Sequence, residues 1–195
     1  IDTVNNLSPV EGKIIMSNLC SEIMQVQTPS VINDAQEYEK LGTDISCNLG
    51  STNIVNMMKS PDFERSVEIA VRALTFVTDH SNVEAVPTVK HGNDIAHTIG
   101  LGAMGLHTFF ALNAMEYGDE ESIEFTDMYF RLLNYYSLKA SNKIAKERNL
   151  KFYNFENSKY ATGEYFDAYI KEDFNIKSDK VRNLFADIHI PSRKD

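Results

Sequence analysis

A long helical pattern between residues 120 and 148 constrains the fold more than any other feature of the sequence. Apolar or small side chains recur there on one side of the predicted helix: Ile123, Met128, Phe130, Leu133, Ser137, Ala140 and Ile144. Acidic residues gather early in the segment and basic residues late, as the helix dipole favours. Gly118 and Asp119 mark the break before it. One face of this helix must be buried against other elements.

Two further helices are expected upstream. The first begins at 60–62, with Ser60 as N-cap and Pro61 in the first turn, and ends near 80–82. Its apolar side chains also recur at helical spacing: Phe63, Val67, Val71, Leu74 and Val77. The second is expected from Asp94 through the glycine stretch to about Asn113, with Pro87 in the connector before it.

The other segments predict a mixed, helix-rich α/β chain. Residues 44–55 are expected to form a short strand around Ile45 and Cys47, followed by an irregular turn. The polar segment 33–42 is expected to lie on the surface. Aromatic residues beyond 150 predict a small cap of short helices: Phe152, Tyr153, Phe155, Tyr160, Tyr165, Phe166 and Tyr169.

Composition excludes several classes of protein. The 195 residues are enough for one domain with a core. A net charge of -9 argues against binding to the phosphate backbone of DNA or RNA, which clustered Lys and Arg provide, although a free nucleotide needs only one local group of donors. No apolar run suits a membrane span, and the first residues do not resemble a signal peptide. Two cysteines are too few for a secreted disulfide framework. We therefore expect a cytoplasmic protein without membrane contacts, and no histidine spacing predicts a metal site.

Residues 16–23 carry the most reactive combination of side chains. Polar residues alternate there with apolar or small ones. In an extended segment, Asn18, Cys20 and Glu22 would share one face, with Leu19 and Ile23 as anchors on the other. That face would combine an amide, a thiol and a carboxyl. The alternative is a buried structural cysteine, because free Cys usually behaves as a small hydrophobe.

Several stretches together resemble the large, catalytic subunit of ribonucleotide reductase. Residues Ser17–Ile23 are similar to its active-site loop, where an Asn-x-Cys-x-Glu triad lies at the tip of a finger loop inside a barrel. Asp44–Ser51 resembles the segment with one of its two redox-active cysteines. His97–His107 resembles a glycine-rich helical stretch further along, and Tyr135–Asn142 fits as well. The stretches occur in the family's order, and the resemblance covers most of the chain.

The resemblance implies a fold and its divisions. The chain would be a helix-rich fragment of a ten-stranded α/β barrel with a central finger loop that carries the active-site cysteine. Residues 1–30 would form the finger-loop region, 43–56 the strand with the redox cysteine, 60–148 helices that cover the barrel, and 149–195 an aromatic-rich cap. Other parts of the parent chain would lie outside this sequence, and the fragment alone is expected to show no turnover.

The resemblance also implies an activity, the reduction of ribonucleoside diphosphates to 2′-deoxyribonucleotides by thiyl-radical chemistry. Cys20 would carry the thiyl radical. Glu22 would be the general base for the 3′-hydroxyl, and Asn18 would hold the sugar hydroxyls, with Ser17, Asn18 and Glu22 as the substrate-binding set. Cys47 would be one of two thiols that close to a disulfide, and its partner would lie upstream of Ile1.

Partners and cofactors implied by the resemblance lie outside this chain. A small subunit with a dimetal centre (Mn or Fe) and a tyrosyl radical would supply the radical. A glutaredoxin- or thioredoxin-like protein would supply electrons, and effectors of the ATP and dATP type would bind elsewhere in a homodimeric parent. The stretch 45–50 is most similar to the aerobic class with a separate metal subunit, class Ib in particular, whereas the anaerobic formate-using branch lacks the acid at Glu22.

Two tempting signals are set aside. Gly100–Gly105 satisfies G-x-G-x-x-G, but a dinucleotide site needs a preceding strand and an acid about 20 residues on, at the end of a second strand. Here 91–98 is polar, and Glu124 lies within a helical pattern. The adjacent Tyr135 and Tyr136 suggest a radical relay, but their helical context favours a place in the core.

Two alternative functions remain open. Cys20 could act as an ionic nucleophile, which needs a nearby base to lower the thiol pKa, and the nearest histidine in sequence is His80. A non-catalytic interaction module would instead use the long helices and the acidic surface.

Overall fold

The computed structural model describes residues 2–169 and 175–192. The chain divides into two compact units. Unit 1 comprises Ile1–Asn48, Thr75–Gly100 and Leu150–Tyr169, and unit 2 comprises Leu49–Leu74, Leu101–Asn149 and Ile170–Asp195. Helix α3 (Phe63–His80) contributes residues to both units.

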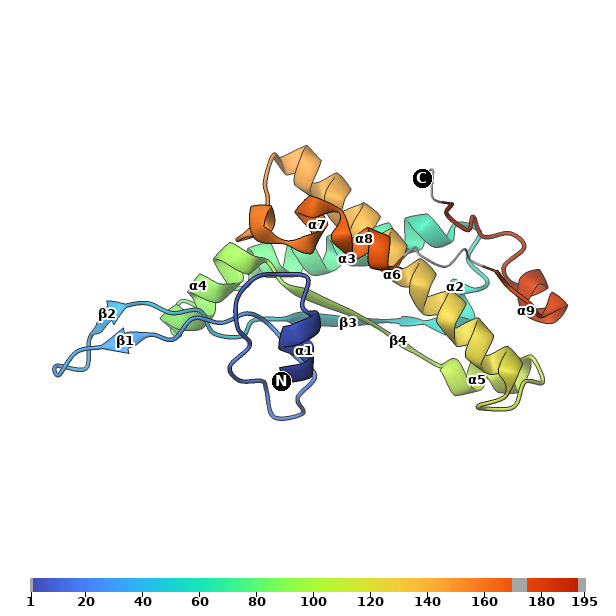
Figure 1. Cartoon of the computed structure of the whole chain (residues 1–195), viewed down its shortest axis with the longest axis horizontal. Coiled ribbons are helices and arrows are strands. Elements are labelled where there is room, and N and C mark those ends of the chain that lie inside the picture. Colours follow the sequence, from blue (N-terminus) through green and yellow to red (C-terminus); the bar gives the residue numbers. More distant parts are fainter. Residues whose placement is uncertain (1, 170–174, 193–195) are drawn as a thin grey trace. The chain divides into compact units, whose positions relative to one another are not determined.

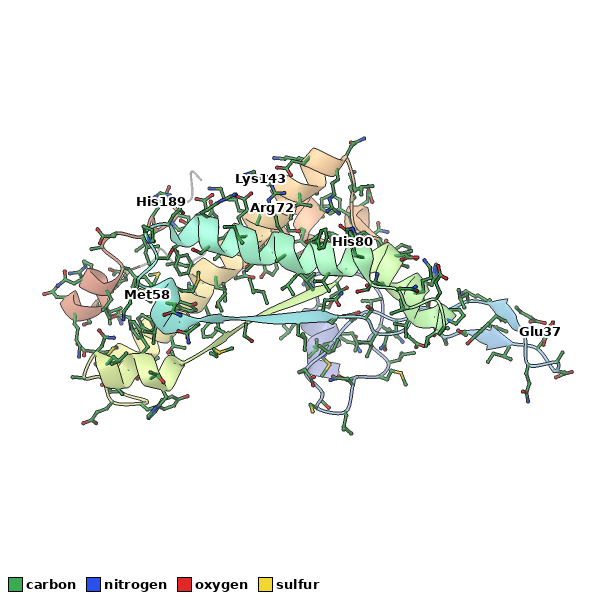
Figure 2. All side chains as sticks on the ribbon, turned by 180° about the vertical axis from the view of Figure 1, so that it is seen from behind. Glu37, Met58, Arg72, His80, Lys143 and His189 are labelled. Carbon is green, nitrogen blue, oxygen red and sulfur yellow. The ribbon has the colours of Figure 1, made fainter. Side chains whose placement is uncertain are left out.

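Unit 1 is built from short elements and long connecting segments. Its elements are α1 (Asp2–Leu7), β1 (Val31–Ile32), β2 (Tyr38–Lys40), α4 (Pro87–Ala96), the 3-10 helix η1 (Phe155–Asn157), α7 (Lys159–Thr162) and α8 (Glu164–Tyr169). Strands β1 and β2 form an antiparallel hairpin, and all residues of the two strands are exposed. Figure 1 shows this hairpin extending as a narrow ribbon from the other elements of the unit, and Figure 2 labels Glu37 at its tip. The surface excursion expected over 33–42 is confirmed for 34–40, whereas Gly42 at its end is buried.

The aromatic segment after residue 150 packs on itself. The Phe152 ring contacts the Phe155 ring edge-on at 5.3 Å, and the rings of Tyr160 and Tyr165 lie 4.7 Å apart. Burial raises the pKa of Tyr160 to about 12. The backbone N–H of Lys159 donates to the carbonyl of Pro9 at 2.7 Å, which ties this segment to the N-terminal residues. Short helices are confirmed here, although Tyr153 is exposed. The expected cap also included the Tyr169 side chain and residues 170–174 and 193–195, which lie outside the described residues.

Unit 2 contains a pair of strands with a helix after each. Strand β3 (Asn48–Asn53) pairs with β4 (Ile99–Met104), and α2 (Ile54–Met57) and α5 (Leu106–Leu112) follow them. In Figure 1 both strands run in the same direction, toward α2 and α5. Gly102 lets the strands approach closely, because a Cβ there would lie 3.3 Å from Ser51 Oγ. The Thr52 hydroxyl donates to the Gly102 carbonyl at 3.2 Å.

The structure corrects three expectations around these strands. The predicted helix over 94–113 is wrong: α4 ends at Ala96, His97 adopts a left-handed conformation, and the glycine stretch is β4. Pro87 occupies the first turn of α4 rather than a connector. The strand expected around Ile45 and Cys47 begins only at Asn48, so Cys47 lies directly before β3.

Helix α6 (Glu120–Arg148) has the bounds that the sequence predicts. Asp119 caps its first turn by accepting a hydrogen bond from the Ser122 N–H at 2.6 Å, and Asn149 ends it in a left-handed conformation. Its buried face contains Phe125, Met128, Tyr129, Leu132, Leu133, Tyr136, Ala140 and Ile144. Ile123 and Phe130 were expected on that face but are exposed. The core position expected for Tyr135 and Tyr136 is confirmed for Tyr136, whereas Tyr135 is half-buried.

The core of unit 2 is aromatic. The fully buried Phe125 ring lies 4.3 Å from that of Phe109 and 5.3 Å from that of Phe185. Phe185 directly follows α9 (Asp179–Leu184), which begins near α6: the carboxylate of Glu124 accepts from the backbone N–H groups of Lys177 and Ser178. Burial of large rings provides most of the packing here.

The ends of α3 differ in part from expectation. Asp62, not Ser60, caps the helix, because its carboxylate accepts from the Arg65 N–H at 2.8 Å. Four of the five expected apolar residues are buried, whereas Val77 is exposed.

An ion-pair cluster joins α3 to α6 within unit 2. Glu68 on α3 binds Arg72 at 2.8 Å and Lys143 of α6 at 2.9 Å. Arg72 also reaches Glu147 of α6 with two nitrogen atoms, at 2.7 and 2.8 Å. Figure 2 labels Arg72 and Lys143 on these neighbouring helices. Hydrogen bonds from Lys143 and Arg72 lower the pKa of Glu68 to about 2.

Candidate active site

The candidate site begins with a loop, residues 13–27, whose two arms are joined at their base by Gln27. The Gln27 backbone N–H donates to the Lys13 carbonyl at 3.0 Å. The Gln27 side-chain oxygen accepts from the N–H groups of Ile15 and Met16, at 3.2 and 3.0 Å. Gln27 is buried. These bonds replace the regular ladder of a β-hairpin, so the arms are joined without forming strands.

A tight turn lies at the tip of this loop. The Ser21 N–H donates to the Asn18 carbonyl at 3.0 Å, and Ser21 has a φ of 59°. The Oδ1 atom of Asn18 accepts from the Ile23 N–H at 3.0 Å, and the Ser17 hydroxyl donates to the Ile23 carbonyl at 2.7 Å. The expected extended alternation is therefore wrong at 18–21. Short polar side chains bond to nearby backbone groups and so stabilise a turn in place of a strand.

The turn presents Cys20 to solvent. Cys20 is exposed, which contradicts the alternative of a buried structural cysteine. Leu19 was expected to be an anchor but is fully exposed, at 100%. Ile23 is buried and is the anchor that the sequence predicts. Glu22 lies between Cys20 and this anchor and is exposed.

The structure brings Glu22 close to Cys47. The Cys47 thiol is half-buried, and burial raises its pKa; the nearby Glu22 carboxylate raises the pKa further. A hydrogen bond also connects the loop to this segment, because the Gln25 amide donates to the Ser46 carbonyl at 2.8 Å. Two of the predicted site residues, from segments that the sequence separates, are therefore neighbours.

The structure does not support His80 as a base for Cys20. One ring nitrogen of His80 hydrogen-bonds with the Phe76 carbonyl of the same helix at 2.8 Å. The imidazole also stacks on the Phe76 ring, with centroids 3.9 Å apart. Within residues 2–169 and 175–192, no group of three or more His, Cys, Asp or Glu side chains is placed to hold a metal ion. No helix in the same ranges is long and apolar enough to cross a membrane.

Comparison with known proteins supplies the family. The family described as "Ribonucleotide reductase, barrel domain" matches residues 1–190. The chain belongs to this family. Among curated members, the ribonucleoside-diphosphate reductase subunit alpha of Mycoplasma pneumoniae is 44% identical over 100% of this chain and 28% of its own length. The subunit alpha of Bacillus subtilis is 43% identical over 94% of this chain and 26% of its own length. That of Treponema pallidum is 33% identical over 89% and 22%. The chain therefore spans between 22% and 28% of the length of these relatives.

This barrel-domain chain also uses residues that the sequence analysis did not single out. Gln27 joins the arms of the loop, and Gln25 attaches the loop to the Cys47 segment. The side-chain oxygen of Asn93 on α4 accepts a hydrogen bond from the Ser46 hydroxyl at 3.0 Å. Buried amides leave no periodic signal, because hydropathy patterns treat them as surface residues. Their proximity to residues 16–23 or 44–51 was the available clue for the two glutamines, whereas nothing in the sequence pointed to Asn93.

Proposed function

We propose that this chain is the active-site segment of the large subunit of a cytoplasmic ribonucleoside-diphosphate reductase of class Ib. The observation that carries the proposal is the exposed Cys20 on a tight turn, followed by a Glu22 carboxylate close enough to the second cysteine, Cys47, to raise its pKa. The family match and the names of the relatives support it.

We infer the larger architecture from the same family. In the parent protein, the paired strands β3 and β4 with their following helices would be part of the ten-stranded α/β barrel. The loop 13–27 would be the finger loop in its centre. The bonds of Gln27 and Asn18 support this assignment, because they give the loop a defined shape of its own.

The proposed reaction converts a ribonucleoside diphosphate and two thiols into a 2′-deoxyribonucleoside diphosphate, a disulfide and water. The Cys20 sulfur, as a thiyl radical, takes the 3′ hydrogen atom of the ribose and returns it at the end. The S–H bond formed is comparable in strength to the C–H bond broken, so the transfer can run both ways. Glu22 takes the proton of the 3′-hydroxyl while the 2′-hydroxyl leaves as water.

Cys47 and an upstream cysteine of the parent would supply the two electrons and two protons of this reaction when they close to a disulfide. The raised pKa of Cys47 suits this task, because it keeps the thiol in the S–H form near neutral pH. The Glu22 carboxylate that helps to raise it would be the same group that accepts the substrate proton. The Glu22 carboxylate therefore helps to keep the Cys47 thiol protonated.

Asn18 would have two roles. Its Oδ1 atom holds the turn by accepting from the Ile23 N–H. We assign its Nδ2 group to a sugar hydroxyl of the substrate, which would fix the ribose against Cys20. Ser17 donates to the Ile23 carbonyl and supports the same turn. The proposed substrate-binding set is thus Ser17, Asn18 and Glu22.

The proposed partners act outside this chain. A small subunit with a dimetal tyrosyl-radical centre would generate the radical, and a glutaredoxin- or thioredoxin-like protein would reduce the disulfide. Nucleotide effectors would bind elsewhere in the homodimeric parent. The isolated 195-residue chain would show no turnover, since these parts belong to other segments or proteins.

The decisive test uses the full-length parent with its small subunit. Cys20→Ser should abolish deoxynucleotide formation with every reductant. Cys47→Ser should abolish it with the protein reductant but retain partial activity with dithiothreitol, which can replace the disulfide-forming thiols. Undiminished turnover in Cys20→Ser would overturn the proposal.

An ionic cysteine nucleophile is the second candidate, because Cys20 is exposed. Rapid labelling of Cys20 by iodoacetamide at pH 6, together with full ribonucleotide reduction in Cys20→Ser, would favour it. An interaction module would instead be favoured by a partner whose binding, like the activity of the parent, survives Cys20→Ser.

A further inference from the structure

Helix α4 turns a polar face toward the segment that leads to Cys47. Its buried residues are Thr88, Gly92 and Asn93, none of which has a large apolar side chain. Thr88 and Gly92, four positions apart, lie on the same side of the helix, and Asn93 lies about 100° further round it than Gly92. Such a face gains little from apolar burial. Its contacts must therefore be directional.

Thr88 and Gly92 contact Asp44, at the start of the segment that leads to Cys47. The Asp44 N–H donates to the Thr88 carbonyl at 3.1 Å, and the Thr88 hydroxyl donates to the Asp44 carboxylate at 2.5 Å. Gly92 lies so close that a Cβ there would be 2.3 Å from the Asp44 carbonyl oxygen. Helix and segment thus touch backbone to backbone.

Asn93 connects the next part of the segment to α3. The side chain is 4% exposed, and both of its ends are bonded. Its oxygen accepts from the Ser46 hydroxyl at 3.0 Å, and its nitrogen donates to the Thr78 carbonyl at 3.0 Å. The Thr78 hydroxyl in turn accepts from the Asn48 amide at 2.8 Å. Both neighbours of Cys47 in the chain are therefore fixed through Asn93 and Thr78.

The loop that carries Glu22 reaches the same segment from another direction. Gln25 donates to the Ser46 carbonyl at 2.8 Å, so Ser46 is bound to α4 through its hydroxyl and to the loop through its backbone. The position of Cys47 relative to Glu22 depends on both bonds. Removing the hydroxyl bond to Asn93 would leave Ser46 attached to the loop but no longer bonded to α4.

We propose that Asn93 is a positioning residue for Cys47: by joining Ser46 to Thr78, it fixes the place of the Cys47 thiol beside Glu22. Asn93 touches neither substrate nor sulfur in this proposal. The naming of Cys47 as a redox thiol rests on the proposed function. The geometric claim is separate and can be tested without turnover.

Loss of the Asn93 side chain should be visible in the reactivity of Cys47. Once Ser46 has lost its bond to α4, the Cys47 thiol would move away from the Glu22 carboxylate and toward solvent, and burial and that carboxylate both raise the Cys47 pKa. The pKa should fall. Because the thiolate is the reactive form, a lower pKa should raise the rate of alkylation at pH values below it, by at least about threefold.

The experiment measures alkylation of Cys47 by iodoacetamide in the reduced full-length parent, from pH 6 to 10, by mass spectrometry of the Cys47 peptide. Asn93→Ala should shift the profile to lower pH and raise the rate at pH 7.5 at least about threefold. Ser46→Ala removes only the hydroxyl of the same bond and should shift the profile in the same direction. Asn82→Ala is the matched control, because this exposed amide bonds only locally, to the Glu84 N–H at 3.3 Å.

A double variant shows whether the two residues act through one bond. Asn93→Ala combined with Ser46→Ala should shift the profile no further than Asn93→Ala alone, since the shared interaction is already lost. If Asn93→Ala does not fold, Ser46→Ala decides the question alone. A profile identical to that of the unsubstituted protein in the folded variants would overturn the proposal.

Turnover measurements separate this proposal from the function on which it rests. With the protein reductant, Asn93→Ala should lower kcat at least about threefold and leave KM for the ribonucleoside diphosphate unchanged, because Cys47 is not assigned to substrate binding. An unsubstituted parent without reductase activity would refute the proposed function, while the alkylation profiles would still decide the role of Asn93. An unshifted alkylation profile in an active enzyme would refute only the role of Asn93.

Discussion

The backbone N–H of Ile23 donates to the side-chain oxygen of Asn18 at 3.0 Å. The amide expected to hold the substrate is therefore also part of the turn that presents Cys20. Mutation can test the oxygen and the NH2 group of Asn18 separately, because only the oxygen accepts this hydrogen bond.

Asn18→Ala should cost about 1–3 kcal/mol of local stability, because the Ile23 N–H loses its acceptor. Turnover of the parent should fall at least about tenfold. Asn18→Asp keeps the oxygen and should preserve the turn, yet it loses the NH2 donor and should still impair turnover. Amide hydrogen exchange at Ile23 and steady-state kinetics would measure the two effects.

The control for Asn18 is Asn33→Ala. Asn33 makes the same kind of bond, accepting from the Glu37 N–H at 2.9 Å, but in the exposed β1–β2 hairpin. Its loss should leave turnover unchanged. Equal damage from Asn33→Ala and Asn18→Ala would contradict a specific role for Asn18.

Gly92→Ala should destabilise the protein, although alanine normally favours a helix by about 1 kcal/mol. The new Cβ would lie 2.3 Å from the Asp44 carbonyl oxygen, so α4 would have to move. Gly102→Ala is the comparison, since its Cβ would meet the Ser51 hydroxyl at 3.3 Å, a contact that a small shift relieves. Thermal unfolding of the parent variants should rank Gly92→Ala as clearly the worse of the two.

Phe125→Ala should lower the free energy of unfolding by about 3–5 kcal/mol, because a fully buried ring is removed from the aromatic core. Ile123→Ala, two positions earlier on α6, should cost less than about 1 kcal/mol, since Ile123 is 60% exposed. Urea denaturation of the 195-residue chain measures both. Similar losses at the two positions would mean that the face of α6 has been assigned wrongly.

The ion-pair cluster predicts a pH dependence of stability. The folded-state pKa of Glu68 is about 2, below its usual 4.5, so the stabilisation is present above pH 4.5 and is lost as the pH falls toward 2. The difference in urea midpoint between the unsubstituted chain and Glu68→Gln should therefore be largest near pH 7 and shrink between pH 4.5 and 2. Glu156→Gln, in the exposed pair with Lys151, should have little effect at any pH.

Local chemistry explains which parts of the fold were predictable. Helix α6 was found with its correct bounds because Asp119 caps it and its charges follow the dipole. Helix α4 was missed because its buried face is polar, and β4 because glycine-rich sequence carries neither a helical nor a strand period. The prediction for Ile123 is wrong because apolar residues of α6 lie on two adjacent faces of the helix. The sequence does not show which of these faces is buried.

The candidate site shows the same division. The residue types at 18, 20 and 22 identified the loop, but the turn depends on bonds between the Asn18 side chain and the backbone, which no alternation reveals. The proximity of Glu22 to Cys47 depends on how the chain folds, because the two residues are 25 positions apart in the sequence. Only the family resemblance suggested that these segments belong to one site.

The polar inner side of α4 has a consequence for protein engineering. A generic amphipathic helix put in its place would bring the wrong chemistry to Asp44 and Ser46, whose partners are a hydroxyl, a bare backbone and an amide. A design that moves the Cys47 segment into a new scaffold must therefore include this helix. Otherwise it must rebuild the hydroxyl donor of Thr88, the close backbone approach at Gly92 and the amide acceptor of Asn93.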